Sequence, residues 1–398
     1  MFYFNLNLLQ FYVSKKTIMS KSIIGRIAFC GTRGLPANYG GFETAVDEIT
    51  SRFVQHGYSV DVFCRLSSSA VVFSEHEGRR LIMVNGAAFR SLETFASAIQ
   101  TGLYLVRHRN EYEHVFWFNN ANLPGILLTM LAGIPVTINT DGMEWRRRKW
   151  SLPFKAYYFL TSWLLSRIAP CLISDSAGIQ SFYKEKFQRD SHLIPYGVST
   201  FLQETLSHQS EILQSYGLEA GRYFLQITRI EPDNLPLEIV NKFIQSGMAK
   251  LGYKFVIVGY KEQTPYAQKL KKLNDCSGVI VLPSNYDQQV LHTLRHNSFC
   301  YVHGNSVGGT NPALLEAMNT CPRIMAIDVI FSKEVLGLFG NYFSLDNLCQ
   351  VFLDSISFPD KSVELKKHVQ NNYQWDAVAA SYMAIVENKD PSYSPAAQ

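Results

Sequence analysis

YVHGNSVGGTNPALLEAM, residues 301–318, is the stretch that most strongly indicates the fold of this chain. Its apolar start predicts a strand, and Pro312 suits the first turn of a helix. Between them, the main-chain N–H groups of Gly308, Gly309 and Thr310 would form a positive nest suited to a diphosphate. A strand, a glycine-rich turn and a helix in this order predict a nucleotide-binding α/β domain.

Two charged residues are predicted to lie beside this nest. Glu316 falls one turn into the helix, where its carboxylate could accept hydrogen bonds from two sugar hydroxyls. An isolated helix glutamate is usually solvated, but its position behind the nest favours a ligand. Arg229 ends the strand YFLQITRI (223–230), where its planar guanidinium could bind phosphate; a surface salt bridge is the competing interpretation. We expect Asn311 to belong to the same donor site.

A second glycine-rich stretch, GTRGLPANYGGFET (31–44), follows the first predicted strand (23–31). Its glycines allow backbone to come close to a bound group, and a turn-rich connector is the weaker alternative. The spacing matches neither G-x-G-x-x-G nor G-K-[ST], so nicotinamide and ATP chemistry are not indicated. Two groups of residues are predicted to contact substrates. Gly31, Arg33 and Gly34 would contact the donor, the substrate that carries the diphosphate. Gly40, Gly41 and Glu43 would contact the second substrate, the acceptor.

The segment DGMEWRRRKW (141–150) carries the candidate catalytic residues. Asp141 and Glu144 follow a predicted strand and would face the cleft expected between the two halves of the chain. There they could orient or deprotonate an acceptor hydroxyl. Capping of the next helix is an equally good interpretation of Asp141. Arg146 and Arg147 are predicted to contact the acceptor.

An apolar, aromatic segment, WSLPFKAYYFLTSWLLSRIAP (150–170), follows this basic run. Cations beside such a helix could hold a polyprenyl-diphosphate acceptor at the inner leaflet of a membrane. A buried interdomain helix beside a solvated charge cluster explains the pattern equally well.

Strand-like apolar runs alternate with helical segments twice along the 398 residues, which is enough chain for two cores. This pattern predicts an α/β protein with two Rossmann-like, doubly wound domains that face each other across a cleft. The expected divisions are a tail or mis-assigned start at 1–21, an N-terminal domain at 22–198, a linker at 199–220, a C-terminal domain at 221–374 and a final helix at 375–390 that could return to the first domain.

Composition narrows the class of protein and its compartment. A net charge of +4, with 47% hydrophobic residues, indicates a globular protein and not a nucleic-acid binder. The seven cysteines are dispersed without paired spacing, which predicts buried thiols in the reducing cytoplasm. Residues 1–18 make a poor signal peptide and are too short to span a bilayer, so a loose tail or mis-assigned start is favoured over a membrane-surface anchor.

These motifs, together with ISDS (173–176), IPYGV (194–198) and ITRIEPDN (227–234), resemble those of bacterial rhamnosyltransferases of glycosyltransferase family 4. The likeness extends over about residues 22–390, with the motifs in the expected order. It implies a GT-B fold, a nucleotide-sugar donor in the C-terminal domain, an acceptor in the N-terminal domain, and neither metal nor cofactor. It also implies retention at the anomeric carbon and dTDP-L-rhamnose as the donor.

The resemblance also assigns roles to individual residues. It implies that Glu316, the second glutamate of the family's E-x7-E pattern, binds the nucleotide ribose, and that Arg229 neutralises the donor diphosphate. Two positions depart from the pattern, because Gly308 stands where the first glutamate is expected and Asn234 where a lysine is common. Arg33 or Lys261 could supply the missing cation.

Taken together with the sequence, this resemblance implies a retaining glycosyltransferase that acts on a lipid-linked saccharide during capsule, exopolysaccharide or O-antigen synthesis. It would work in the cytoplasm, with a peripheral position on the inner face of the plasma membrane as an extension of this hypothesis. The alternatives are a transferase with another nucleotide-sugar donor, a GT-B sugar-nucleotide epimerase that would depend on His303, and a non-catalytic nucleotide-sugar binding protein.

Overall fold

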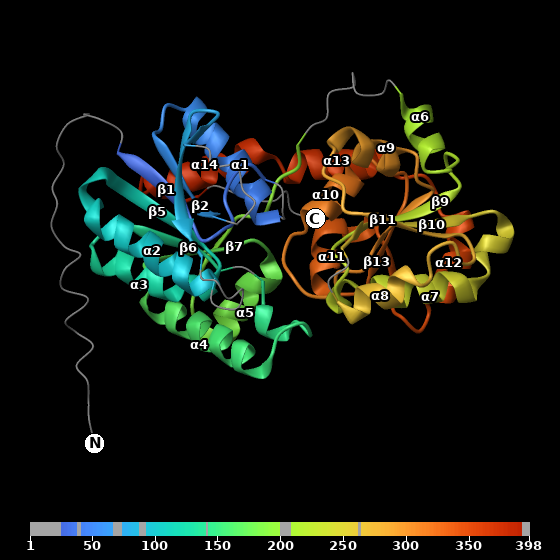
Figure 1. Ribbon diagram of the computed structural model, residues 1–398, viewed down its shortest axis with the longest axis horizontal. Helices are drawn as coiled ribbons and strands as arrows, with labels where there is room; N and C mark the ends of the chain where they lie inside the picture. Colours follow the sequence, from blue (N-terminus) through green and yellow to red (C-terminus); the bar gives the residue numbers. More distant parts are fainter. Residues whose placement is uncertain are drawn as a thin grey trace.

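The computed structural model describes residues 25–37, 41–66, 74–86, 93–140, 142–199, 208–261 and 264–391, which form two lobes (Figure 1). Each lobe is built on one β-sheet, of eight strands in the first and six in the second. Among the described helices, none is long and apolar enough to cross a bilayer.

The sheet of the first lobe has the order β3-β4-β2-β1-β5-β6-β7-β8, and all its pairs are parallel except β3 with β4. The chain winds outward from β1 in one direction and then returns to β5 on the other side, so the topological switch lies between β1 and β5. The strands are β1 (Arg26–Cys30), β2 (Val60–Leu66), β3 (Glu75–His76), β4 (Arg79–Asn85), β5 (Tyr112–Phe118), β6 (Val136–Asn139), β7 (Cys171–Ser174) and β8 (His192–Leu193).

Helices cover both faces of this sheet. Most of its strands are therefore buried on both sides. Ala98, Ile126 and Leu165, from three successive helices, share one core with Trp117 of β5. The opposite face packs against the first helix. The helices are α1 (Gly41–Gln55), α2 (Glu93–Arg107), α3 (Leu123–Leu131), α4 (Leu152–Ile168) and α5 (Ala177–Phe187), with the short 3₁₀ helix η5 (Glu144–Arg146) before α4.

The sheet of the second lobe is parallel throughout, in the order β11-β10-β9-β12-β13-β14. Counted along the chain this is the 3-2-1-4-5-6 order of a dinucleotide-binding domain, with the switch point between β9 and β12. Its strands are β9 (Tyr223–Ile227), β10 (Lys254–Tyr260), β11 (Val279–Pro283), β12 (Cys300–His303), β13 (Ile324–Ile327) and β14 (Asn341–Phe343). Its helices are α6 (Gln209–Ser215), α7 (Pro236–Ser246), α8 (Pro265–Lys271), α9 (Gln288–His296), α10 (Pro312–Met318), α11 (Ile330–Leu336), α12 (Leu348–Asp354) and α13 (Ser362–Asn372).

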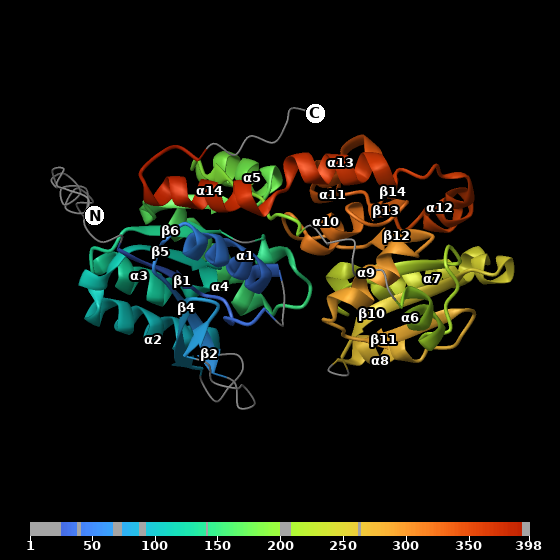
Figure 2. The same cartoon turned by 90° about the horizontal axis from the view of Figure 1, so that it is seen from above.

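The last helix, α14 (Trp375–Val386), leaves the second lobe and packs on the first, beside α1 (Figures 1 and 2). Tyr382 receives a hydrogen bond from the amide of Asn139 at 3.1 Å and packs against Phe116 of β5. Arg52 of α1 forms an ion pair with Asp376 at 2.5 Å. The chain therefore crosses between the lobes twice, and α14 ties the C-terminal end to the first lobe.

The two doubly wound α/β units predicted from the sequence are confirmed. Two features differ from the prediction in detail. The polar stretch predicted as the linker contains α6, which forms because Leu213 packs into a core and Gln209 accepts a hydrogen bond from Asn297 at 3.1 Å. The short strands β3, β8 and β14 and the longer β4, which lies next to the edge strand β3, were not foreseen; in β4 two leading arginines mask a short apolar run.

Candidate functional site

The carboxyl ends of both sheets turn toward the seam between the lobes, and three loops meet there. They are residues 31–37 after β1, residues 142–150 after β6 and residues 304–311 after β12. These are the loops in which the sequence placed its candidate residues. Asp141 and Gly40 fall outside the described residues, so their predicted roles remain predictions.

Two of the glycines predicted to approach a donor are closely approached by other atoms of the first domain. Gly31 has φ +94°, and a Cβ there would lie 2.2 Å from the carbonyl oxygen of Phe118 at the end of β5. Gly34 has φ +99°, and its Cβ would collide with Cys64 of β2 at 2.3 Å. Both glycines are therefore needed to fold the loop, whether or not a ligand also approaches it.

Glu43 holds this loop in place from the start of α1. Its carboxylate accepts a hydrogen bond from the main-chain N–H of Arg33 at 3.0 Å. Burial raises the pKa of Glu43, and the hydrogen bond and nearby Arg33 and Arg65 oppose that rise. Gly41, two residues earlier, faces the other lobe, because a Cβ there would lie 3.1 Å from Pro312 at the start of α10.

The glycine turn of the second lobe is one of the points where the two lobes touch. A Cβ on Gly142 would lie 3.3 Å from the Cα of Gly308. A Cβ on Gly309 would lie only 1.9 Å from the carboxylate of Asp175, and the buried hydroxyl of Thr310 donates to the main-chain oxygen of Asp175. The turn predicted to cradle a diphosphate thus also allows close contact between the domains, with a carboxylate on its Gly309 side.

Asn311 and Glu316 have partners within the second lobe. The side chain of Asn311 caps α10 by accepting from the N–H of Ala313 at 2.9 Å. The carboxylate of Glu316 pairs with the guanidinium of Arg295 on α9, which is only 2% exposed, whereas the Glu316 side chain is 28% exposed. Glu316 is therefore held by a buried cation and keeps one side open to solvent.

A charge cluster joins the lobes around Glu231, in the loop after β9. Its carboxylate lies 3.8 Å from Arg229 of its own domain, and 3.3 Å and 3.9 Å from Lys149 and Arg147 of the first domain. Burial would raise the pKa of Glu231, but the three cations together lower it below its ordinary value. One carboxylate thus gathers three cations from two domains.

Residues 142–150 contribute Arg147 and Lys149 to this cluster and make further contacts on either side of it. Glu144 is buried, pairs with Arg147 and accepts a hydrogen bond from the indole of Trp150 at 2.6 Å. The main-chain N–H of Arg148 donates to Asp233 of the second lobe at 2.9 Å. Arg146 instead extends toward α5, where its guanidinium lies 5.7 Å from the centre of the Phe182 ring.

Several residues at the seam were missed by the sequence analysis, among them Glu231 of the charge cluster. Asp175, Asp233 and Glu334 each reach across to the opposite lobe; Glu334 accepts hydrogen bonds from the N–H groups of Ala177 and Gly178 at the start of α5. Burial raises the pKa of Glu334, and the two N–H groups oppose this. Their only signal in the sequence is a position directly after a strand or within a short helix.

His303, on which an epimerase would depend, is a core residue. It is 4% exposed, and burial lowers its pKa to about 4. His114 of β5 is buried in the same way, with its pKa also lowered to about 4. Neither imidazole would therefore serve as an acid at neutral pH.

The same burial predicts a loss of stability in mild acid. An unfolded histidine binds a proton near pH 6.5, whereas folded His303 remains neutral down to about pH 4, so its contribution is full above pH 6.5 and is lost as the pH falls toward 4. Linkage gives a loss of about 2 kcal/mol between pH 8 and pH 5 for this residue. Urea unfolding of His303→Gln should show a flatter pH profile than the parent, whereas replacement of the exposed His56 should not. Parallel profiles for the parent and His303→Gln would contradict this expectation.

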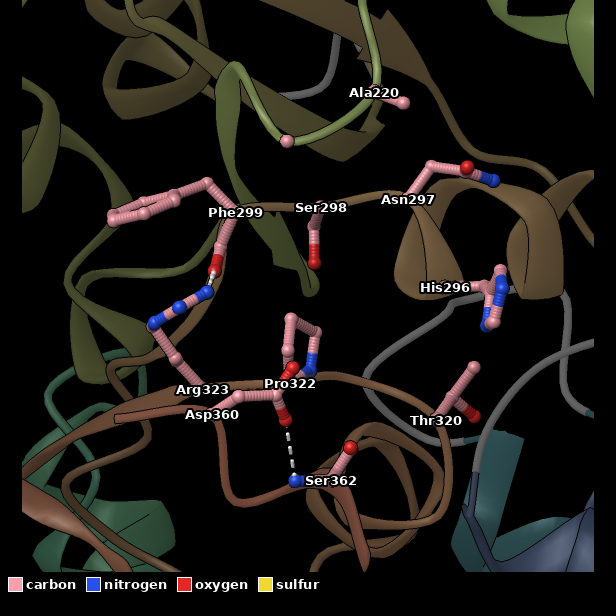
Figure 3. A pocket seen from close by; sticks show the side chains of 11 residues that line it. Ala220, His296, Asn297, Ser298, Phe299, Thr320, Pro322, Arg323, Asp360 and Ser362 are labelled. Carbon is pink, nitrogen blue, oxygen red and sulfur yellow. Dashed lines mark hydrogen bonds between the residues drawn. The ribbon is translucent and has the colours of Figure 1, made fainter. Parts of the chain in front are cut away.

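A separate cavity of about 290 Å³ lies at the opposite end of the second sheet (Figure 3). It is lined by residues that precede β9, β12 and β13, among them Gly221, Phe299 and Arg323. Arg323 donates to the main-chain oxygen of Phe358 at 2.8 Å. The cavity is thus at the amino ends of the strands, away from the loops that carry the candidate site.

One group of side chains among the described residues has the composition of a metal site. Ligand atoms of Asp47, His76 and Glu77 lie within 4.8 Å of one another. Both carboxylates, however, pair with the buried guanidinium of Arg79, which occupies the position of a cation. The group is best explained as an ion-pair network at the edge of the first sheet.

Comparison with known proteins supports the fold. The family described as "Domain of unknown function (DUF1972)" matches residues 25–199. No curated protein sequence matches the chain. Sucrose-phosphate synthase from Thermosynechococcus elongatus is similar in structure, with TM-score 0.73 and 15% identity over 92% of this chain and 98% of that one.

Two further solved structures have the same architecture. Anabaena Alr3699/HepE in complex with UDP and glucose gives TM-score 0.70 at 13% identity, and an α,α-trehalose-phosphate synthase (UDP-forming) from Burkholderia vietnamiensis gives 0.65 at 10%. Each alignment covers 92% of this chain and 100% of the other. The chain therefore has the GT-B fold, as the sequence predicted.

Proposed function

We propose that this protein is a retaining glycosyltransferase that transfers L-rhamnose from dTDP-L-rhamnose to a lipid-linked saccharide in cell-surface polysaccharide synthesis. The observation that carries the proposal is the convergence of Arg229, Glu231 and the Gly308 turn at the switch point of the second Rossmann-type sheet, where Arg147 and Lys149 of the first lobe meet them. Switch points are where such sheets bind nucleotides. HepE, which has the same fold, was solved in complex with UDP and glucose.

The position of the donor in the site is inferred from the charges around it. The leaving group is a nucleoside diphosphate, on which negative charge develops as the glycosidic bond breaks, and cations placed in advance lower that barrier. Because Asp175 lies on the Gly309 side of the turn, we expect the diphosphate on the Gly308 side, toward Arg229. Glu316, whose carboxylate is held by Arg295 and stays partly exposed, would accept hydrogen bonds from the ribose hydroxyls.

The acceptor half belongs to the first domain. Glu144 is engaged by Arg147 and Trp150, so it is suited to orienting its neighbours and not to removing a proton. Asp141 remains the candidate for contact with the acceptor hydroxyl. In a retaining reaction the departing phosphate oxygen can take that proton itself, so a side-chain base is not required. The reaction as proposed uses neither a metal nor a cofactor.

The surface beside the acceptor half favours a lipid-linked acceptor. The exposed face of α4 carries Leu152, Phe159, Leu160 and Trp163, which are 41–80% exposed, so this helix is not buried between the domains. The neighbouring helix α2, whose Phe95 ring lies 5.3 Å from the ring of Tyr157 on α4, exposes Phe95, Ile99, Leu103 and Val106 along one stripe. Neither α4 nor residues 94–107 contain an acidic residue. An apolar, aromatic and cationic surface suits the interface of an anionic bilayer, which would place the protein at the inner face of the plasma membrane.

The proposal is tested by incubating the protein with dTDP-L-rhamnose and a polyprenyl-diphosphate-linked sugar, with mass spectrometry and NMR of the product. Transfer with retained anomeric configuration supports it. Transfer only from another nucleotide sugar would replace the donor, isomerised donor without transfer would indicate an epimerase, and binding without turnover would indicate a non-catalytic protein.

We expect the α4 surface to govern membrane binding. Changing Phe159, Leu160 and Trp163 together to serine should reduce co-sedimentation with vesicles containing phosphatidylglycerol by about tenfold or more, because each apolar side chain contributes on the order of 1 kcal/mol when it enters the interface. The same change at Leu338, which is 94% exposed on the second lobe, should have little effect. Equal binding of the triple variant and the parent would exclude this surface.

A further inference from the structure

Two guanidinium groups, one from each domain, approach the same carboxylate at the seam. Arg147 of the first domain and Arg229 of the second lie 3.9 Å and 3.8 Å from the two oxygens of Glu231. Arg147 is buried, whereas the Arg229 side chain is 49% exposed. The two groups are therefore spaced so that a single anionic group can contact both.

Arg147 also lies against the glycine turn. Its Nη2 atom would be 3.8 Å from a Cβ built on Gly308, a residue with φ +153°. Gly142 meets the same turn at 3.3 Å, so the segment that carries Arg147 is held against the second domain. The guanidinium of Arg147 thus borders the space on the Gly308 side, opposite the carboxylate of Asp175.

Lys149 also lies 3.3 Å from Glu231, but its ammonium group packs over the indole of Trp150 at 4.9 Å, whereas Arg147 borders Gly308. Asn234 is 1% exposed, and its amide donates to the main-chain oxygen of Arg229 at 2.9 Å, so it shapes the loop without adding charge. Lys261 donates to the hydroxyl of Tyr286 at 3.1 Å.

The geometry points to Arg147 as the second cation of the donor-diphosphate site, contributed across the seam by the domain that binds the acceptor. This inference rests on the proposed function and extends it. A diphosphate between Arg147 and Arg229 would accept charge-assisted hydrogen bonds from both domains. Because the pair is complete only when the lobes are closed, the charge on the leaving group would itself favour the closed, reactive arrangement.

The test is isothermal titration of dTDP and dTMP, with UDP and UMP alongside, into the parent and into Arg147→Gln, Arg147→Lys and Arg148→Gln. Arg147→Gln should weaken diphosphate binding about tenfold to hundredfold, the usual size of one hydrogen bond to a charged group, and monophosphate binding by much less. Arg147→Lys should recover part of the loss. Arg148 sits next in the chain with an exposed side chain and contacts Asp233 through its main chain, so Arg148→Gln should bind both nucleotides as the parent does.

A purely structural role for Arg147 makes the opposite prediction for a second variant. If Arg147 only held the lobes together through Glu231, then Glu231→Gln should weaken diphosphate binding as Arg147→Gln does. If Arg147 binds the phosphate, Glu231→Gln removes a competing carboxylate and should leave diphosphate binding unchanged or tighten it.

The outcomes separate the two levels of the proposal. A parent that binds none of the four nucleotides overturns the proposed function and this inference together. A parent that binds dTDP or UDP, with Arg147→Gln binding it equally well or with Glu231→Gln weakened to the same degree, overturns the role of Arg147 alone.

Discussion

Glu316→Ala should raise the donor KM by about a hundredfold and also lower the free energy of unfolding by about 3 kcal/mol. The first effect is expected because a carboxylate bound to two ribose hydroxyls contributes two charge-assisted hydrogen bonds. The second follows from Arg295, which is 2% exposed and would lose the carboxylate that pairs with it. Removing one partner of a buried ion pair leaves an uncompensated charge, which is strongly destabilising.

The two effects can be separated by changing both partners. Arg295→Met combined with Glu316→Ala removes the orphaned charge and fills the space with an apolar side chain, so stability in urea should return toward that of the parent. The donor KM should remain high, because the carboxylate is still absent. If the double variant recovers donor affinity as well as stability, Glu316 has only a structural role and the proposed ribose contact is wrong.

Arg295 shows why sequence alone located Glu316 but not its environment. The turn and helix around Glu316 carry a local pattern, since glycines, a proline and a periodic helix follow one another within 18 residues. The partner lies on α9, in a segment rich in polar residues that gives no hint of a buried arginine. Pairings between elements depend on the tertiary fold, which no local pattern encodes.

The sheets were predictable for a related reason. Strands such as β9 and β10 are buried on both faces and therefore appear as continuous apolar runs between helices, which predicts a parallel sheet. β4, which lies next to the edge strand β3 of the first sheet, lacks that signal. The same logic explains α6, whose single buried leucine is too weak a pattern to distinguish a short helix from a linker.

The glycines illustrate the limit of motif reasoning most clearly. Glycine-rich stretches were correctly located at strand ends, and close backbone approach was the stated reason for them. What approaches differs from one glycine to the next: Gly31 meets β5, Gly34 meets β2, and Gly309 meets Asp175 of the other domain. A sequence motif shows that space is required at a position, but not which part of the molecule fills it.

Gly309→Ala should therefore reduce kcat/KM by about a hundredfold while the melting temperature stays close to that of the parent. The new Cβ would lie 1.9 Å from the carboxylate of Asp175, which is itself buried and cannot swing away into solvent. The lobes would have to separate by an ångström or more, and a displacement of that size between reacting groups can cost about a hundredfold in rate. One apolar cluster includes residues of both lobes, but each lobe also has a further core built mainly from its own residues, so stability should change little.

Graded controls are available at the same seam. Gly142→Ala and Gly41→Ala would meet the opposite lobe at 3.3 Å and 3.1 Å, distances that small adjustments can absorb, so each should cost less than tenfold. Asp175→Ala removes the colliding atoms, and adding it to Gly309→Ala should restore activity to the level of Asp175→Ala alone, whereas Asp175→Asn, which keeps the bulk, should not. If catalysis requires the close contact between these domains, the rate has to fall when an alanine side chain prevents that contact. Full activity in Gly309→Ala would therefore mean that catalysis does not require it.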